Sequence, residues 1–138
     1  MPSLTVPASL EQLARVHAYI REHVPCEYEE VLGHVLLAAE ELLVNIFTYA
    51  YQGAHGPAEV DCRLVQRDGQ KFLCFMVKDW GPAFDPFHEA PAPDLDRPID
   101  DRPIGGLGIH LIKPLATHVS YTRLHDANVV ELYFAKST

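Results

Sequence analysis

Basic residues are scarce in this 138-residue chain. Lysine and arginine together number 11, against 19 aspartates and glutamates, so the formal net charge is −8. Binding to the phosphate backbone of DNA or RNA depends on a patch of basic side chains that displaces counterions. The basic residues here are scattered along the sequence. We therefore expect no nucleic-acid partner.

Cysteine is also sparse, and its spacing excludes two common kinds of site. Cys26, Cys62 and Cys74 form neither an even set nor a CxxC pair, so the sequence indicates no disulfide framework. We expect three buried free thiols. The eight histidines show no HxxxH or HExxH spacing, which argues against a zinc site.

Long hydrophobic runs are missing too. No uncharged apolar stretch approaches the roughly 20 residues that span a bilayer, and the segment MPSLTVPASLEQ has neither the basic region nor the apolar core of a signal peptide. We expect a cytoplasmic protein without a membrane partner. The apolar fraction of 48% is ordinary for a globular protein, and the length predicts one domain over residues 1–138.

Helical periodicity dominates the first third of the chain. After a short extended stretch, Ser9 can cap a helix over residues 10–23, which ends before Pro25. A longer helix is predicted over residues 28–50, because its apolar residues recur at spacings of three and four.

A hairpin follows the second helix. Residues 58–67 and 70–78 read as two strands joined through an Asp-Gly dipeptide, the strongest short hairpin signal. A two-residue loop fixes the register, so that Cys62 lies opposite Phe75.

The last third of the chain predicts a loop, a helix and two strands. Residues 87–105 are rich in proline and acidic residues and are expected to form an exposed loop. A glycine-led helix follows. Strands over residues 118–124 and 128–135 are predicted to join around Asp126-Ala127-Asn128.

Three polar residues interrupt the apolar pattern of the longer helix. Glu41, Asn45 and Tyr49 follow one another at intervals of four and so form a stripe, with Glu40 about 100° around the helix axis. One interpretation is a stripe that faces solvent. The other is a magnesium-nucleotide site, in which a carboxylate orients the nucleophile and an amide oxygen is a hard ligand for the ion.

A glycine segment, Gly105-Gly106-Leu107-Gly108, opens the last predicted helix. It lacks the Lys-Ser/Thr of a Walker loop, and no strand precedes it as in a dinucleotide-binding fingerprint. Two interpretations remain: backbone NH groups at a helix start that bind phosphate, or a loop end in close contact with the sheet. The acidic loop before it lacks the pattern of a calcium loop.

The order of these features is specific. The chain has Glu-x-x-x-Asn on a helix, then Asp-x-Gly at a strand end in VKDWGPAFDP, then Gly-Gly-Leu-Gly before a helix. This order resembles the Bergerat-type ATP-binding fold shared by histidine kinases, type II topoisomerases and mismatch-repair ATPases. Over nearly its whole length, from LTVPASLEQLARVHAYI to GGLGIHLIKPLATHVSYTRLHDANVVELYF, the chain is most similar to bacterial anti-sigma-factor serine/threonine kinases of partner-switching systems.

The resemblance implies a fold and a set of site residues. The expected fold is an α/β (α+β) two-layer sandwich, in which three helices cover one face of a mixed, mainly antiparallel sheet of about five strands. Asp79 would accept a hydrogen bond from the exocyclic amine of adenine, and Gly81 would let the base approach the backbone. Glu41 matches the general base of the family, and Asn45 matches its Mg²⁺ ligand.

Other positions either match the family or depart from it. Gly106 and Gly108 match glycines at the end of the lid, so the segment Gly105, Gly106, Leu107 and Gly108 would bind the phosphates. Phe84 and Asp85 match a Phe-Asp pair with an expected structural role. Tyr49 stands where many relatives have histidine, and Ala83 where they have glycine.

The function implied is that of an ATP-binding anti-sigma factor that phosphorylates a small STAS-type antagonist, with ATP and Mg²⁺ as cofactors. Its partners would be that antagonist and a sigma factor, and a homodimer is compatible with the resemblance. Tyr49 favours one alternative, a nucleotide-gated module that sequesters a partner with little or no phosphoryl transfer. A further alternative is an ATP hydrolase.

Overall fold

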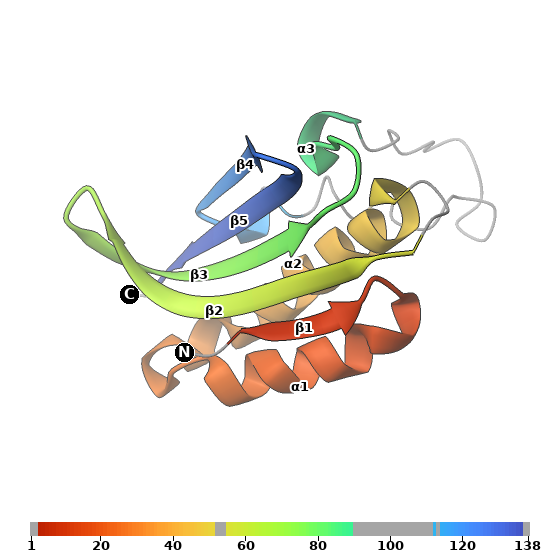
Figure 1. Ribbon diagram of the computed structural model, residues 1–138. Helices are drawn as coiled ribbons and strands as arrows, with labels where there is room; N and C mark the ends of the chain where they lie inside the picture. Colours follow the sequence, from red (N-terminus) through yellow and green to blue (C-terminus); the bar gives the residue numbers. More distant parts are fainter. Residues whose placement is uncertain (1–2, 52–54, 90–111, 113, 137–138) are drawn as a thin grey trace, which may run out of the picture.

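The protein is a helix layer packed on one face of a twisted sheet (Figure 1). The computed structural model describes residues 3–51, 55–89, 112 and 114–136. Five strands within these residues form one sheet in the order β1-β2-β3-β5-β4. Their bounds are Leu4–Pro7 (β1), Pro57–Arg67 (β2), Gln70–Asp79 (β3), His118–Leu124 (β4) and Ala127–Ala135 (β5).

All four strand pairings are antiparallel. The predicted two-layer α+β class is therefore confirmed, but the sheet in the described part of the chain has no parallel component and is not mixed. The two hairpins, β2-β3 and β4-β5, give two of these antiparallel pairings. The other two arise because β1 runs antiparallel to β2 and β5 runs antiparallel to β3.

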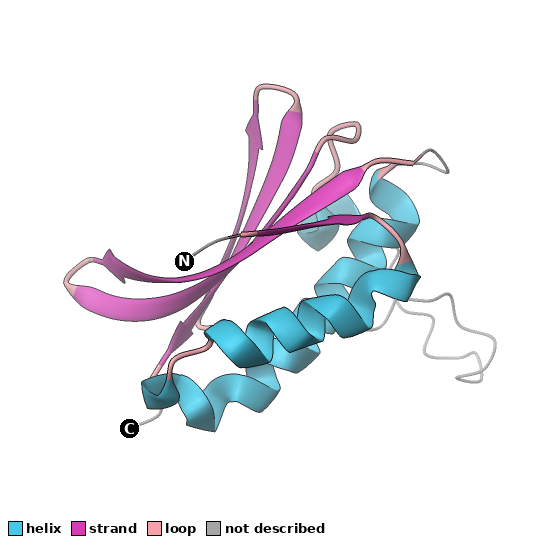
Figure 2. Ribbon diagram, turned by 60° about the horizontal axis from the view of Figure 1, so that its bottom comes forward, coloured by secondary structure: helices cyan, strands magenta, loops and turns pink. Residues whose placement is uncertain are grey.

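Two long helical stretches lie on the same face of the sheet (Figure 2). The first begins with a 3-10 turn, Leu10–Gln12 (η1), and continues as Leu13–His23 (α1). Ser9 caps it as predicted, because its hydroxyl accepts a hydrogen bond from the backbone N of Glu11 at 3.4 Å.

The second helical stretch changes its winding twice. A 3-10 turn, Cys26–Val31 (η2), leads into Leu32–Asn45 (α2), and a π turn, Ile46–Ala50 (η3), follows. The helix predicted over residues 28–50 is thus confirmed. A short helix, Pro86–Glu89 (α3), lies where the sequence predicts the beginning of a loop.

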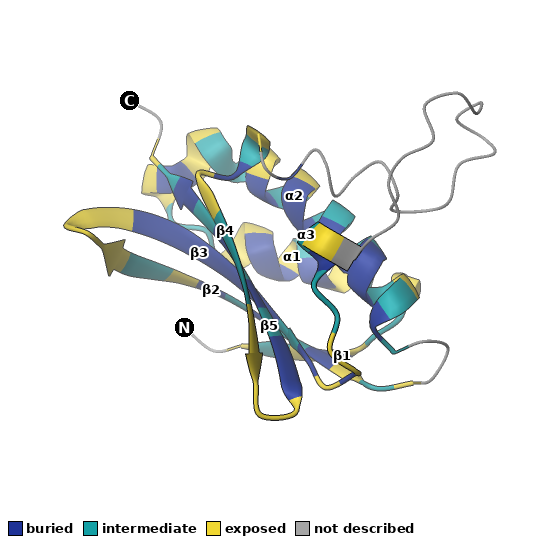
Figure 3. Cartoon of the chain, turned by 90° about the horizontal axis from the view of Figure 1, so that it is seen from above, coloured by how far each residue is buried: buried dark blue, intermediate teal, exposed yellow. Residues whose placement is uncertain are grey.

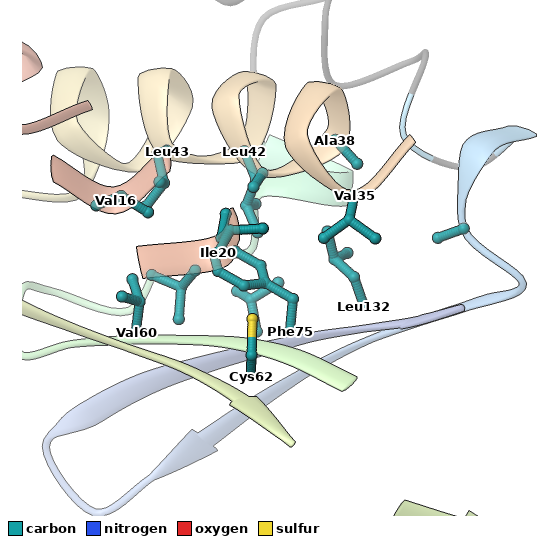
Figure 4. Packing of buried hydrophobic residues seen from close by; sticks show 14 of the residues in the cluster. Val16, Ile20, Val35, Ala38, Leu42, Leu43, Val60, Cys62, Phe75 and Leu132 are labelled. Carbon is teal, nitrogen blue, oxygen red and sulfur yellow. The ribbon is translucent and has the colours of Figure 1, made fainter. Parts of the chain in front are cut away.

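The core lies between the helices and the sheet (Figure 4). One face of each long helix contacts the inward positions of β2, β3 and β5. The labelled residues are Val16, Ile20, Val35, Ala38, Leu42, Leu43, Val60, Cys62, Phe75 and Leu132, all fully buried. Burying an aliphatic or aromatic side chain of this size stabilises the fold by about 1.5–3 kcal/mol. Exposed residues lie on the outer helix faces and at the hairpin tips (Figure 3).

The register of the first hairpin is as predicted. Cys62 pairs with Phe75, and the turn falls at Asp68-Gly69, where both residues have positive φ. The second hairpin turns one residue earlier than predicted, at His125-Asp126, because His125 takes the left-handed conformation with φ of 57°. Asn128, predicted as the first residue of the last strand, is the second residue of β5.

One expectation about cysteine is wrong. Cys62 and Cys74 are buried free thiols, but Cys26 is exposed because it begins the turn η2 at the surface.

The segment Cys26–Ala50 is long and apolar enough to cross a membrane by length and composition. The sequence analysis had found no such stretch. Val35, Ala38, Leu42 and Leu43 of this segment belong to the core that packs on the sheet, so it is the central helix of this domain.

Candidate functional site

Asp79 ends β3 on the face of the sheet that the helices cover. Leu73, Phe75 and Val77 of the same strand belong to the core, and side chains alternate along a strand, so Asp79 points the same way. Its exposed fraction is 1%. Burial raises the pKa of this carboxyl above its ordinary value, while hydrogen bonds from Asn128 and Gly81 and the charge of Arg123 oppose the rise.

The carboxylate is held from one side. Its Oδ1 accepts hydrogen bonds from the backbone N of Gly81 at 3.0 Å and from Nδ2 of Asn128 at 2.9 Å. Within the described residues no hydrogen bond reaches Oδ2. That oxygen is the atom that the site offers to a donor on a ligand.

Gly81 lies where no side chain fits. A Cβ atom at this position would come within 2.5 Å of the backbone oxygen of Ala50 and 3.3 Å of Asp79 Oδ1. The turn after β3 therefore touches the end of the second helical stretch backbone to backbone. The family resemblance implied a close approach of a ligand at this glycine, which stays a prediction; the structure shows the end of the helix in the space that a side chain would take.

Two more contacts join this turn to the helix end. The hydroxyl of Tyr51 accepts a hydrogen bond from the backbone N of Trp80 at 3.0 Å and donates one to the carbonyl oxygen of Pro57 at 2.6 Å. The rings of Tyr49 and Phe84 lie with their centroids 6.2 Å apart. Tyr49 thus contacts the loop that follows Asp79.

Asn45 is fully buried, with an exposed fraction of 0%, so the interpretation of the polar stripe as facing solvent is wrong for this residue. The helix turns its side chain toward the interior instead. Its Nδ2 donates to the backbone oxygen of Glu41 at 3.2 Å, which helps to fix the orientation of its amide. Asn45 is the residue just before the π turn, a kind of turn that is frequent at functional sites.

Glu41 lies one helical turn before Asn45 and is half-buried. Burial raises the pKa of its carboxyl, and the neighbouring charge of Glu40 adds to the rise. A carboxylate with a raised pKa is a better proton acceptor at neutral pH. Asn45 is the last residue of α2, and Ala50, which ends the following π turn, contacts Gly81. Asn45 therefore lies near the end of the helical stretch that meets the Asp79 turn, and Glu41 lies one helical turn further away.

Asn128 is a site residue that the sequence analysis missed. It pairs with Asp79 in the ladder between β3 and β5, and it is 1% exposed. The alternation in β5 could have found it, because Val130, Leu132 and Phe134 all face the core and Asn128 is in phase with them. The sequence analysis counted it as the first residue of the last strand and as part of the connecting turn, and gave it no functional role.

The loop after the turn is organised by Asp85. Its Oδ1 accepts from the backbone N of Phe87 at 3.0 Å, and its Oδ2 lies 2.7 Å from Nδ1 of His88. Both contacts hold the short helix α3, which is the structural role expected of this residue.

The predicted phosphate-binding residues Gly105, Gly106, Leu107 and Gly108 lie outside the described residues, as does most of the predicted lid. Ile112 and Leu115 are helical, in the region of the predicted glycine-led helix.

A nucleotide with Mg²⁺ fits the residues that are described. Asp79 Oδ2 suits an amine donor, and Asn45 carries an amide oxygen, which is a hard ligand type for Mg²⁺. No cluster of three or more His, Cys, Asp or Glu residues that could hold a metal ion occurs among the described residues.

A hollow of about 500 Å³ lies at the end of β1 and the start of β2, at the same end of the sheet as Asp79, which pairs with Ala58 of β2. It is lined mostly by apolar surface, and His55 is its one ionisable side chain among the residues described. Its chemistry does not match a nucleotide as the Asp79 region does.

The chain is similar to known proteins in family, sequence and fold. The family model of the histidine kinase-like ATPase domain matches residues 6–134. Serine/threonine-protein kinase BtrW of Bordetella bronchiseptica is 34% identical over 96 residues, which cover 70% of this chain and 65% of that protein. The match thus spans just under two thirds of that relative.

A solved structure gives the same fold. The crystal structure of the RsbU and RsbW domains of a Mycobacterium tuberculosis protein matches with a TM-score of 0.55. The match covers 100% of this chain and 33% of that one, at 14% identity. At this identity the likeness concerns the fold.

Proposed function

The chain belongs to the family of histidine kinase-like ATPase domains, and on this premise we propose that it binds ATP with Mg²⁺ and phosphorylates a serine or threonine of a small antagonist protein. In this proposal it is also an anti-sigma factor, and the antagonist and a sigma factor are its two partners. The antagonist would be of the STAS type that the resemblance implies.

One observation carries the proposal. A buried carboxylate ends a central strand, a glycine two residues later touches the helix at Ala50, and the same helix holds Glu41 and Asn45. A buried acceptor of this kind is costly unless it meets a donor, and adenine offers one in its exocyclic amine. In this proposal the phosphates of the nucleotide would extend toward the polar residues of the helix.

The residues of the helix support transfer as well as binding. Asn45 would supply an oxygen to Mg²⁺, and the ion, when bound, would neutralise charge on the phosphates. Glu41 would accept or orient the proton of the attacking hydroxyl, for which its raised pKa is suited. The relative BtrW is named a serine/threonine-protein kinase, which supports a hydroxyl acceptor on a protein.

The test is a transfer assay. The purified protein is incubated with [γ-³²P]ATP and Mg²⁺ in two samples. One sample also contains a candidate antagonist from a neighbouring reading frame, and the other does not. We expect label on a serine or threonine of the antagonist. Release of free phosphate at the same rate without antagonist would instead identify an ATP hydrolase. Tight ATP binding without either product would contradict the kinase proposal.

The contact of Tyr49 with Phe84 favours a second candidate, a nucleotide-gated module that sequesters its partner. The ring of Tyr49 lies on the loop after Asp79, so nucleotide binding at the turn is linked mechanically to the helix end. In that case ATP would raise the affinity for the partner without phosphoryl transfer, which a pull-down with ATP, ADP and no nucleotide would reveal.

A further inference from the structure

We propose that Asn128 is a positioning residue that orients the carboxylate of Asp79 and so makes the site selective for the amine of adenine. The inference rests on the proposed nucleotide binding. No feature of the sequence pattern assigned Asn128 a role, and the inference follows from its hydrogen bonds and its burial.

Asn128 and Gly81 both donate hydrogen bonds to the same carboxylate oxygen of Asp79, which leaves the other oxygen available as an acceptor. The Nδ2 of Asn128 donates to Oδ1 at 2.9 Å, and the backbone N of Gly81 donates to the same oxygen at 3.0 Å. The terminal torsion of an aspartate side chain is broad, so an unrestrained carboxylate would sample several orientations. Two donors on Oδ1 hold the group in one orientation, with Oδ2 as its remaining acceptor.

The amide of Asn128 has its own orientation fixed. Its Oδ1 accepts hydrogen bonds from the hydroxyl of Tyr121 at 2.6 Å and from the backbone N of Phe84 at 3.1 Å. A flipped amide would present its NH₂ group to the NH of Phe84 and would turn an acceptor toward the Asp79 carboxylate. The network therefore determines that the NH₂ group faces Asp79.

This arrangement distinguishes purines by the group at position 6. Adenine carries an amine there, which donates to Oδ2. Hypoxanthine carries a carbonyl, which would place two acceptors against each other in a buried site. A carboxylate that is free to rotate could avoid that repulsion, whereas one held by Asn128 cannot.

Asn128 also anchors the turn, and this second role needs a matched control. The other hydrogen of its Nδ2 reaches the carbonyl oxygen of Pro82 at 2.9 Å. Arg123 anchors the same turn through Nη1, which donates to the carbonyl oxygen of Gly81 at 2.8 Å, with no hydrogen bond to Asp79. Arg123→Gln loosens the turn without removing the donor to Asp79.

The experiment measures the affinities for ADP and IDP, with Mg²⁺, by titration calorimetry for the parent, Asn128→Ser and Arg123→Gln. We expect the parent to bind ADP more tightly than IDP. In Asn128→Ser the ratio of the two affinities should fall about ten-fold, which corresponds to the loss of one charge-assisted hydrogen bond. Arg123→Gln should weaken both nucleotides by a similar factor and keep the preference. Thermal unfolding of each variant confirms the fold.

A second variant guards against misfolding. If Asn128→Ser does not unfold cooperatively, Tyr121→Phe removes only the hydroxyl that orients the Asn128 amide, and we expect it to reduce the ADP preference about three-fold. If Asn128→Ser folds and keeps the parent's preference for ADP over IDP, the inference is overturned. If Asn128→Ser does not fold, an unchanged preference in Tyr121→Phe overturns it. An equal loss of preference in Arg123→Gln would overturn it too. A parent that binds neither nucleotide would overturn the proposed function itself.

Discussion

At the scale of single residues, the buried carboxyl group that Asp79 would offer to a ligand has a cost in folding stability. Its carboxyl is buried, and burial is the main reason that its pKa is raised above the ordinary value of 3.8. A carboxyl group with a raised pKa binds more protons in the folded state than in the unfolded state. Its contribution therefore makes the free energy of unfolding fall as the pH rises from 3.8 through the raised pKa. Above that range the cost of the buried charge is fully present.

We predict that Asp79→Asn weakens ADP binding by about 1.5–3 kcal/mol. The amide oxygen of the new side chain can still accept from Gly81 and Asn128, so the turn keeps its bonds. The NH₂ group then faces the amine of adenine, donor against donor. Calorimetry at about pH 7.5 checks the affinity, and an unchanged value would remove Asp79 from the site.

The same variant tests the sign of the pH dependence. Relative to the parent, Asp79→Asn should gain stability as the pH rises from 3.8 toward neutrality, because the parent alone must then bury a charge. Urea unfolding of both proteins at several pH values measures the difference. A difference that is constant with pH would show that Asp79 titrates as it does in the unfolded chain.

Glu41 and Glu40 form a natural pair of variant and control. We predict that Glu41→Ala lowers the rate of phosphoryl transfer by about 10² to 10⁴ and leaves nucleotide affinity within a few-fold, as for a general base. Glu40 projects about 100° away around the helix, so Glu40→Ala should leave the rate nearly unchanged. Transfer assays and calorimetry on both variants decide the matter. Equal rates for the two variants would exclude Glu41 as the base.

At the scale of elements, the sequence predicts those features that depend on local pattern. The Asp-Gly dipeptide determined the turn and the register of the first hairpin, and the three-and-four spacing predicted the central helix. The burial of Asn45 was not predictable, because its position on the helix is equally suited to a solvated stripe. Asn128 was missed because its pairing with Asp79 depends on the order of strands that are distant in the sequence.

Two glycines lie in contrasting surroundings: Gly81 is in a tight contact between a turn and a helix, and Gly33 is at a helix position with free space around it. We predict that Gly81→Ala costs about 1–3 kcal/mol of stability and reduces nucleotide binding, because its Cβ would come within 2.5 Å of the Ala50 oxygen. Gly33 lies in α2, where an added Cβ atom would meet nothing within 4 Å, so Gly33→Ala should stabilise the protein by about 0.5–1 kcal/mol. Chemical unfolding of both variants measures the opposite signs. A stabilised Gly81→Ala would contradict the close approach of turn and helix.

At the scale of the whole molecule, the antiparallel sheet explains why the site lies where it does. The C-terminal end of β3 and the N-terminal end of β5 meet at one edge because the two strands run in opposite directions, and Asp79 and Asn128 are partners there. The helix layer brings Ala50 to the same edge. Residues far apart in the sequence thus share one site, and a ligand bound there would contact both layers.

A ligand that contacts both layers should stabilise the entire fold. We predict that ADP with Mg²⁺ at about a hundred times its Kd raises the free energy of unfolding by about 2.7 kcal/mol. For a chain of this length that corresponds to an increase in Tm of roughly 8–11 °C. A short DNA duplex at the same concentration should give no increase at physiological salt, since the net charge is −8. Differential scanning calorimetry measures both shifts. With Asp79→Asn at the same ADP concentration the shift should shrink to about 1–5 °C, because the free ligand concentration then lies between about eight times the weakened Kd and just below it. An equal shift in parent and variant would place the stabilising nucleotide elsewhere on the protein.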